Sequence, residues 1–134
     1  MIDTGPIVAL LDADDEAHER CSELLSSTPE WRVIPSPVLP EVDALCRHYR
    51  SREAFSRLLD DVRRGAIQVE DILEEDYERV VELLDTYRDL NVGFVDAAVL
   101  AIVERLGEPK LATLDHRHYA TMRPRHVEAL ELVP

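Results

Sequence analysis

The sequence predicts an α/β fold with a mostly parallel sheet, because short apolar segments alternate with longer helical ones along the whole chain. Two further observations support this class. The chain has 134 residues, of which 46% are hydrophobic and 32% are charged, a composition typical of a globular domain. No internal repeat, low-complexity segment or Gly/Ser linker divides it. We therefore expect a single domain spanning residues 1–134.

Each element of the first half follows from a local pattern. Apolar residues at helical spacing, a short apolar run, and a serine followed by proline at a helix start each predict one element. In chain order we expect a strand end at Met1–Thr4, a helical region at Ile7–Leu25 broken near Ala13 or Asp14, a strand at Trp31–Ile34 and a helix from Ser36 to about Tyr49.

The second half continues the alternation, with Gly65 and Gly107 as helix stops. In chain order we expect a helix at Ser51–Arg64, a strand at Ala66–Val69, an amphipathic helix from Glu74 to about Leu90, a buried helix at Val95–Leu106, and strands at Lys110–Leu114 and His126–Val133. In the amphipathic helix we expect Tyr77, Val80, Val81, Leu84 and Tyr87 to face inward.

The charge balance and the apolar runs exclude several classes of protein. Asp and Glu number 28 against 15 Lys and Arg, so simple electrostatic attraction to nucleic acid or anionic lipid is not expected. The longest apolar run, Ala97–Val103, is far shorter than the roughly 18 residues that span a bilayer. We expect no secretory signal, no membrane contact and a cytoplasmic location. Cys21 and Cys46 lack metal or redox spacing and are expected to be packed, reduced thiols.

Four carboxylates fall where an α/β sheet forms its sites. Ligands bind at the carboxyl ends of parallel strands, and Asp3 and Asp115 end two of the expected strands. Asp96 lies in an otherwise apolar helix, where a charge is costly unless it is paired or binds a metal. Glu41 lies at the edge of an apolar stripe. A structural alternative stays open: Asp96 as a helix N-terminal carboxylate, and Asp3 and Asp115 as turn or cap residues.

Together the four carboxylates favour a hard divalent cation. No cysteine or histidine cluster accompanies them, which disfavours zinc, and a set of oxygen ligands suits Mg²⁺ or Mn²⁺. The cation would relieve the mutual repulsion of the carboxylates. It would also activate water and stabilise an attacked phosphate in phosphodiester hydrolysis.

The same four positions, in order, resemble the motifs of the PIN domain: Asp3 at the first strand end, Glu41 in PSPVLPEVDAL, Asp96 in FVDAAVLA and Asp115 in TLDHRHY. More narrowly, the chain is similar to the VapC-type toxins of bacterial type II toxin–antitoxin modules. The resemblance implies an α/β/α sandwich with four or five central strands. It also implies an Mg²⁺- or Mn²⁺-dependent endoribonuclease that cleaves structured RNA, such as tRNA or rRNA, and thereby inhibits translation. The expected partners are a cognate antitoxin protein and a second copy in a homodimer.

The resemblance also implies residue roles. The catalytic and metal-binding carboxylates would be Asp3, Glu41 and Asp96, with Asp115 completing the cluster directly or through water. Thr4 and Thr113 would orient carboxylates or substrate. From two basic runs, the candidates that would hold the RNA backbone are Arg117, His116, Arg47 and Arg50. Gly5 followed by Pro6 departs from the family pattern and would make a tight entry into the first helix.

Two other functions stay open. A catalytically silent PIN-like module would keep the fold for complex formation alone, and expression toxicity that depends on Asp3 would count against it. A haloacid-dehalogenase-like phosphatase would also place an aspartate at the first strand end. It needs a second aspartate where Gly5 stands and a lysine after a helix, and Lys110 is the only lysine in the chain. A p-nitrophenyl phosphate assay separates this class from a nuclease.

Overall fold

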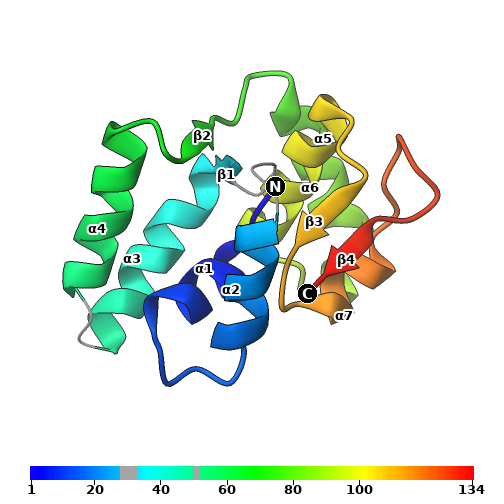
Figure 1. Cartoon of the computed structure of the whole chain (residues 1–134). Coiled ribbons are helices and arrows are strands. Elements are labelled where there is room, and N and C mark those ends of the chain that lie inside the picture. The colour runs from blue at the N-terminus through cyan, green and yellow to red at the C-terminus, as the bar shows by residue number, and fades with distance from the viewer. Residues whose placement is uncertain (28–32, 50–51) are drawn as a thin grey trace.

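A computed structural model describes residues 1–27, 33–49 and 52–134 of the chain. In chain order its elements are α1 (Thr4–Leu11), α2 (His18–Ser27), β1 (Val33–Pro35), the 3₁₀ helix η2 (Ser36–Val38), α3 (Leu39–His48), α4 (Arg52–Arg63), β2 (Gln68–Glu70), α5 (Asp76–Thr86), the 3₁₀ helix η3 (Arg88–Leu90), α6 (Phe94–Leu106), β3 (Lys110–Ala112), α7 (His116–Thr121) and β4 (Glu131–Val133). Helices α3 and α4 lie at one end of the molecule, and β3, β4 and α7 lie at the other (Figure 1).

Two pairs of parallel strands are joined by the N-terminal segment Met1–Asp3. β1 pairs with β2, and β3 pairs with β4. The backbone N–H of Ile2 donates to the carbonyl of Val33 in β1 at 3.0 Å, and that of Asp3 donates to the carbonyl of Ala112 in β3 at 2.9 Å. The N-terminus accordingly lies between β1 and β3 in Figure 1. The spatial order is therefore β2, β1, the N-terminal segment, β3 and β4, and the predicted α/β class is confirmed.

The core is built around α6, as its nearly continuous apolar sequence predicted. All seven residues of Ala97–Val103 are at most 3% exposed. They join one core cluster with Ile34, Leu83 and Leu111 from β1, α5 and β3. Full burial of each large aliphatic side chain contributes about 1.5–3 kcal/mol. The helix ends at Gly107, whose φ of 67° favours glycine, so the predicted stop is confirmed.

Three helix predictions need correction. Ser36 does not cap a helix through its side chain; it starts η2, because the prolines at 35, 37 and 40 lack the N–H groups of a regular turn. α5 begins at Asp76 and ends at Thr86, short of Leu90, and η3 follows it. Its predicted inward face is wrong at Tyr77 and Val81, which are 49% and 59% exposed. The predicted starts at Trp31 and Ser51 lie outside the described residues.

The C-terminal segment differs from its predicted strand. Only Glu131–Val133 pairs with β3, and residues 126–130 form no strand. Side chains from earlier in the chain hold the segment before β4: the N–H of Arg123 donates to the hydroxyl of Tyr87, the C-cap of α5, and that of Arg125 donates to Glu104 in α6. These contacts replace a strand ladder. The structure also contains α7, a helix that the sequence analysis did not predict.

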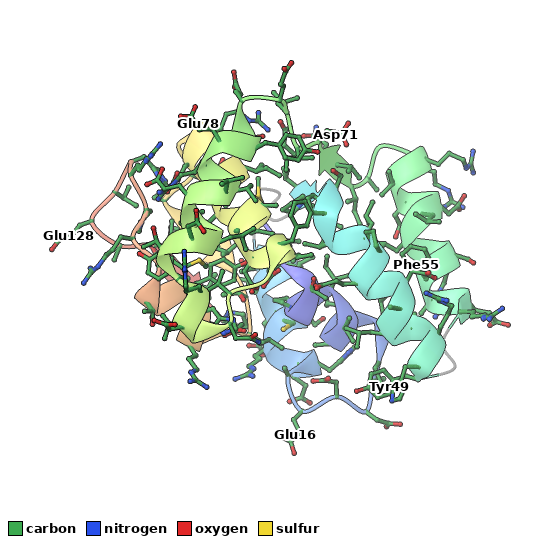
Figure 2. The ribbon with its side chains drawn as sticks, turned by 180° about the vertical axis from the view of Figure 1, so that it is seen from behind. Glu16, Tyr49, Phe55, Asp71, Glu78 and Glu128 are labelled. Atoms are coloured by element: carbon green, nitrogen blue, oxygen red, sulfur yellow. The ribbon has the colours of Figure 1, made fainter. Side chains whose placement is uncertain are left out.

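The acidic excess is spread over the surface. Glu16, Asp71, Glu78 and Glu128 point outward on different sides of the molecule (Figure 2). Cys21 and Cys46 are buried free thiols, as expected, and burial raises the pKa of both. Within the described ranges, every helix is too short or too polar to cross a bilayer.

Candidate active site

The four predicted carboxylates line one open cleft of about 590 Å³. They reach it from the N-terminal segment, the first turn of α3, the first turn of α6 and the turn after β3. The lining residues are Asp3, Thr4, Gly5, Glu41, Asp96, Leu114, Asp115, His116, Arg117 and His118. The structure thus brings together carboxylates that are up to 112 positions apart in the sequence, from Asp3 to Asp115.

Asp3 is the most buried of the four carboxylates, with 6% exposure. Its Oδ2 accepts a hydrogen bond of 2.8 Å from the hydroxyl of Thr113, which is fully buried. Burial raises the pKa of Asp3 to about 6, and the charges of Asp96 and Glu41 add to this rise. The N–H of Thr4 and the Thr113 hydroxyl oppose it. The site therefore holds a carboxylate whose charge is costly in the absence of a cation.

The two predicted threonines each position a carboxylate. The hydroxyl of Thr4 donates to Oε2 of Glu41 at 2.8 Å, which links the start of α1 to the start of α3. The hydroxyl of Thr113 donates to Asp3 and also accepts the N–H of Asp115 at 3.0 Å. Both threonines are buried, whereas Glu41 is exposed at the cleft.

Asp96 and Asp115 are helix-capping residues as well as cleft residues. Oδ2 of Asp96 accepts the N–H of Gly93 at 3.1 Å in a capping box at the start of α6. Oδ1 of Asp115 accepts the N–H of His118 at 3.0 Å, so Asp115 is the N-cap of α7. The alternative in which Asp96 and Asp115 accept backbone N–H groups at helix starts is therefore correct, and it is compatible with their place in the cleft.

His118 is the site residue that the sequence analysis missed. Its Nδ1 lies 2.9 Å from Oδ2 of Asp115 and 3.5 Å from Oδ2 of Asp96. Ligand atoms of these three residues all lie within 4.8 Å of one another. The sequence analysis expected no cysteine or histidine cluster beside the carboxylates and did not consider a single histidine among them. The available signal was the spacing of three residues between Asp115 and His118, which brings them together once α7 forms.

The predicted RNA-binding residues divide into two groups. Arg117 and His116 line the cleft and are exposed. Arg47 is not among the lining residues, and its Nε pairs with Asp43 at 3.1 Å on α3. Arg50 lies outside the described residues. The basic rim of the described cleft is therefore at the start of α7, with one arginine, Arg117.

Gly5 lines the cleft, and Tyr119 is a buried residue of α7, which begins at the cleft. A Cβ on Gly5 would lie 3.0 Å from Cβ of Leu114, so glycine permits α1 to approach the turn between β3 and α7. Tyr119 is 2% exposed, and its hydroxyl has no hydrogen-bond partner among the described residues. Burial and the charges of all four carboxylates raise its pKa well above the usual value.

The residues present fit a divalent cation. Within the described part of the chain, no lysine or arginine forms an ion pair with Asp3, Glu41, Asp96 or Asp115. Carboxylate oxygens that converge without a protein cation suit Mg²⁺ or Mn²⁺. The buried Asp3, with its raised pKa, is the strongest single sign of this fit.

Comparison with known proteins shows which family and fold the chain shares. Residues 1–123 match the PIN domain family. The chain is 27% identical over 124 residues to ribonuclease VapC26 of Mycobacterium tuberculosis strain H37Rv, covering 92% of each protein. It superimposes with a TM-score of 0.79 on the crystal structure of Mycobacterium tuberculosis VapC20, described as a sarcin–ricin loop cleaving toxin. That likeness covers 94% of this chain and 96% of the other at 23% identity, and it concerns the fold.

Proposed function

The chain belongs to the PIN domain family, as its four motifs predicted, and from this premise we propose that it is a metal-dependent endoribonuclease toxin of the VapC type. The observation that carries the proposal is the convergence of Asp3, Glu41, Asp96 and Asp115 in one cleft without a paired lysine or arginine among the described residues. Arg117 and His116 lie at the same cleft, where they would contact an RNA backbone.

In this proposal the protein's own residues would bind the metal ion and fix the orientation of the carboxylates that hold it. Asp3, Glu41 and Asp96 would hold the metal, and Asp115 would complete the set directly or through water. A bound Mg²⁺ or Mn²⁺ would neutralise the carboxylates, supply an activated water and stabilise charge on the attacked phosphate. Thr4 and Thr113 would fix the orientation of Glu41 and Asp3 through the hydrogen bonds described above.

The net negative charge of the chain bears on how it would select its RNA substrate and attract its protein partner. A chain with a formal charge of −13 binds nucleic acid weakly in general, so selectivity would come from the local rim and from RNA shape. The sarcin–ricin loop named for VapC20 is the first structured RNA to test, with tRNA next. A cognate antitoxin with an arginine-bearing tail would be steered to the acidic cleft. We propose that the toxin acts in the cytoplasm as a homodimer.

The test is RNA cleavage by the full chain with Mg²⁺ or Mn²⁺. Asp3→Asn and Asp96→Asn should each reduce the rate by roughly 100-fold or more, because each removes a charged metal ligand. Asp89→Asn, an exposed aspartate in η3, is the matched control and should leave the rate unchanged. EDTA should abolish cleavage, and full activity in EDTA or in either site variant contradicts the proposal. Antitoxin binding without cleavage of any RNA would favour the silent module instead.

A further inference from the structure

The imidazole of His118 lies beside the carboxylates of Asp96 and Asp115, where it could bind the same metal ion. It sits on α7, three residues after the N-cap Asp115, and its side chain is 21% exposed. Because the N–H of His118 donates to Oδ1 of Asp115, the backbone of this turn is fixed. The fixed turn places Nδ1 next to the other oxygen of the same carboxylate and next to Asp96 across the cleft.

The distances between these atoms are those between ligands that share one ion. With metal–ligand bonds of about 2.1 Å, neighbouring ligand atoms lie about 3.0 Å apart in an octahedral site and about 3.4 Å apart in a tetrahedral one. Nδ1 of His118 lies 2.9 Å from Oδ2 of Asp115 and 3.5 Å from Oδ2 of Asp96. Both distances from Nδ1 match those of neighbouring ligands, and ligand atoms of all three residues lie within 4.8 Å of one another.

Two polar atoms at this place are left without a hydrogen bond. Nδ1 of His118 is close to two carboxylates, but it has no hydrogen bond of acceptable geometry within the described ranges. The hydroxyl of the adjacent Tyr119, which is 2% exposed, also has no partner there. A buried polar atom without a partner calls for an explanation, and for Nδ1 of His118, which lies close to Asp96 and Asp115, a bound metal ion supplies one.

We propose that His118 is a nitrogen ligand of the metal site, together with Asp96 and Asp115, and that it makes the site prefer a divalent transition-metal ion over Mg²⁺. The proposal rests on the proposed function for the presence of a metal in this cleft. Mg²⁺ takes oxygen ligands, whereas imidazole binds first-row transition metals with an affinity that rises from Mn²⁺ to Co²⁺ and Ni²⁺. One nitrogen ligand in an otherwise oxygen site therefore changes metal selectivity without removing the hard-cation character of the rest.

The experiment measures metal binding to the full chain after removal of bound metal with EDTA. Isothermal titration with Co²⁺, Mn²⁺ and Mg²⁺ compares the wild type with His118→Gln and with His116→Gln. His116 is the matched control, because it lines the same cleft and, within the described residues, forms no ion pair with the carboxylates. His118→Gln should weaken Co²⁺ binding by about 10- to 100-fold and shift the visible absorption of bound Co²⁺. Mg²⁺ affinity should change by less than about threefold in either variant.

A second measurement needs no substitution, so it holds even where a variant fails to fold. Pulsed electron paramagnetic resonance of the wild-type Mn²⁺ complex should show nitrogen hyperfine coupling from one imidazole. Absence of that coupling, or equal or tighter Co²⁺ binding by folded His118→Gln, overturns the proposal; tighter binding would mean that the imidazole competes with the metal. Nitrogen ligation without RNA cleavage would overturn the proposed function alone. Cleavage without nitrogen ligation would overturn the His118 assignment alone.

Discussion

Two regions of the molecule bury carboxylates, and they treat the negative charge in opposite ways. One is the acidic cleft formed by Asp3, Glu41, Asp96 and Asp115. The other is an arginine network between α5, α6 and β2. It consists of Arg79, Arg105, Glu70, Asp76, Glu82 and Glu104. Asp76 in the network is 3% exposed and Asp3 in the cleft is 6% exposed, so the two regions bury a carboxylate to a similar depth.

In the arginine network the protein supplies the counter-charge itself. Nε of Arg105 lies 3.0 and 3.1 Å from the two oxygens of Asp76, and the N–H of Leu73 donates to the same carboxylate. Arg79 binds both oxygens of Glu104 at 2.8 Å. Such charge-assisted, two-point contacts satisfy a buried carboxylate without any external ion.

In the acidic cleft the partners are neutral hydroxyl and N–H groups, apart from His118. Asp3 has Thr113 and the Thr4 N–H, and its pKa rises to about 6. The similarly buried Asp76 instead faces the guanidinium of Arg105, whose Nε lies 3.0 Å from its Oδ1. The difference teaches that burial alone does not define a metal site. The informative feature is a buried carboxylate for which the fold provides no cation.

The largest expected effect is on the arginine network. Arg105→Met keeps the length of the side chain but leaves the carboxylate of Asp76 buried and unpaired. Removal of one partner from a buried ion pair costs about 3–5 kcal/mol, so urea unfolding at neutral pH should show a loss of that size. The control is Arg88→Met, which breaks an exposed pair with Asp85 and should cost about 1 kcal/mol or less. Equal losses in both variants would mean that the network is not structural.

The second-largest expected effect on the free energy of unfolding is a stabilisation, and it concerns Asp3 in the acidic cleft. The pKa of Asp3 is raised from 3.8 to about 6, so the folded state binds the proton more tightly than the unfolded state. Stability is therefore unaffected by this group below about pH 4 and falls as the pH rises through about 6. A rise of about two units at about 1.4 kcal/mol each gives a cost of roughly 3 kcal/mol at pH 8.

Asp3→Asn should remove that cost. In EDTA at pH 8 the variant should be more stable than the wild type by up to roughly 3 kcal/mol, and at pH 4 the two should be equal. Asp76→Asn is the counterpart in the arginine network and should be destabilising at pH 8. Urea unfolding at the two pH values measures both. A destabilised Asp3→Asn at pH 8 would show that the cleft, like the network, already satisfies its charge.

The comparison also shows what a sequence can and cannot reveal. Asp3 and Asp96 were predictable because the signal is local: a strand end in one case and an apolar helix in the other. His118 was missed because its position depends on α7, a short helix that exists through the Asp115 cap and its packing. Without α7 the histidine has no defined place.

The α5 face and the C-terminal segment were mispredicted for a related reason. The inward side of α5 contains Asp76, whose partner Arg105 is 29 residues away, so hydrophobic periodicity alone assigned the wrong neighbours. Residues before β4 are held by Tyr87 and Glu104, partners that no local pattern reveals. The acidic cleft was thus easier to predict than the arginine network. A carboxylate at a strand end or in an apolar helix can be recognised in the sequence, whereas an ion pair between distant residues cannot.

Addition of a metal ion should stabilise the folded state through the acidic cleft and not through the arginine network. The expected gain is slightly smaller than that from Asp3→Asn. A ligand that binds only the folded state stabilises it by about 2.7 kcal/mol at a free concentration 100 times its Kd. Mn²⁺ at pH 8 should therefore raise the stability of the wild type and of Arg88→Met by the same amount. It should have little effect on Asp96→Asn, measured by thermal unfolding after EDTA treatment. Stabilisation of Asp96→Asn equal to that of the wild type would place the metal elsewhere.

The smallest effect concerns the orientation of a carboxylate in the cleft. Thr4→Val removes the hydroxyl that donates to Glu41 at 2.8 Å and leaves the shape of the side chain nearly unchanged. The loss of one such hydrogen bond costs about 1 kcal/mol of stability, and loss of an orienting partner should weaken metal binding by about tenfold. Thr121→Val is the control, because its exposed hydroxyl donates only to the carbonyl of Arg117 within α7. Thr4→Val with unchanged Mn²⁺ affinity would mean that Glu41 orients itself. Glu41 would then keep its place in the cleft without a fixed partner, unlike the carboxylates of the arginine network, each of which is held by a named arginine.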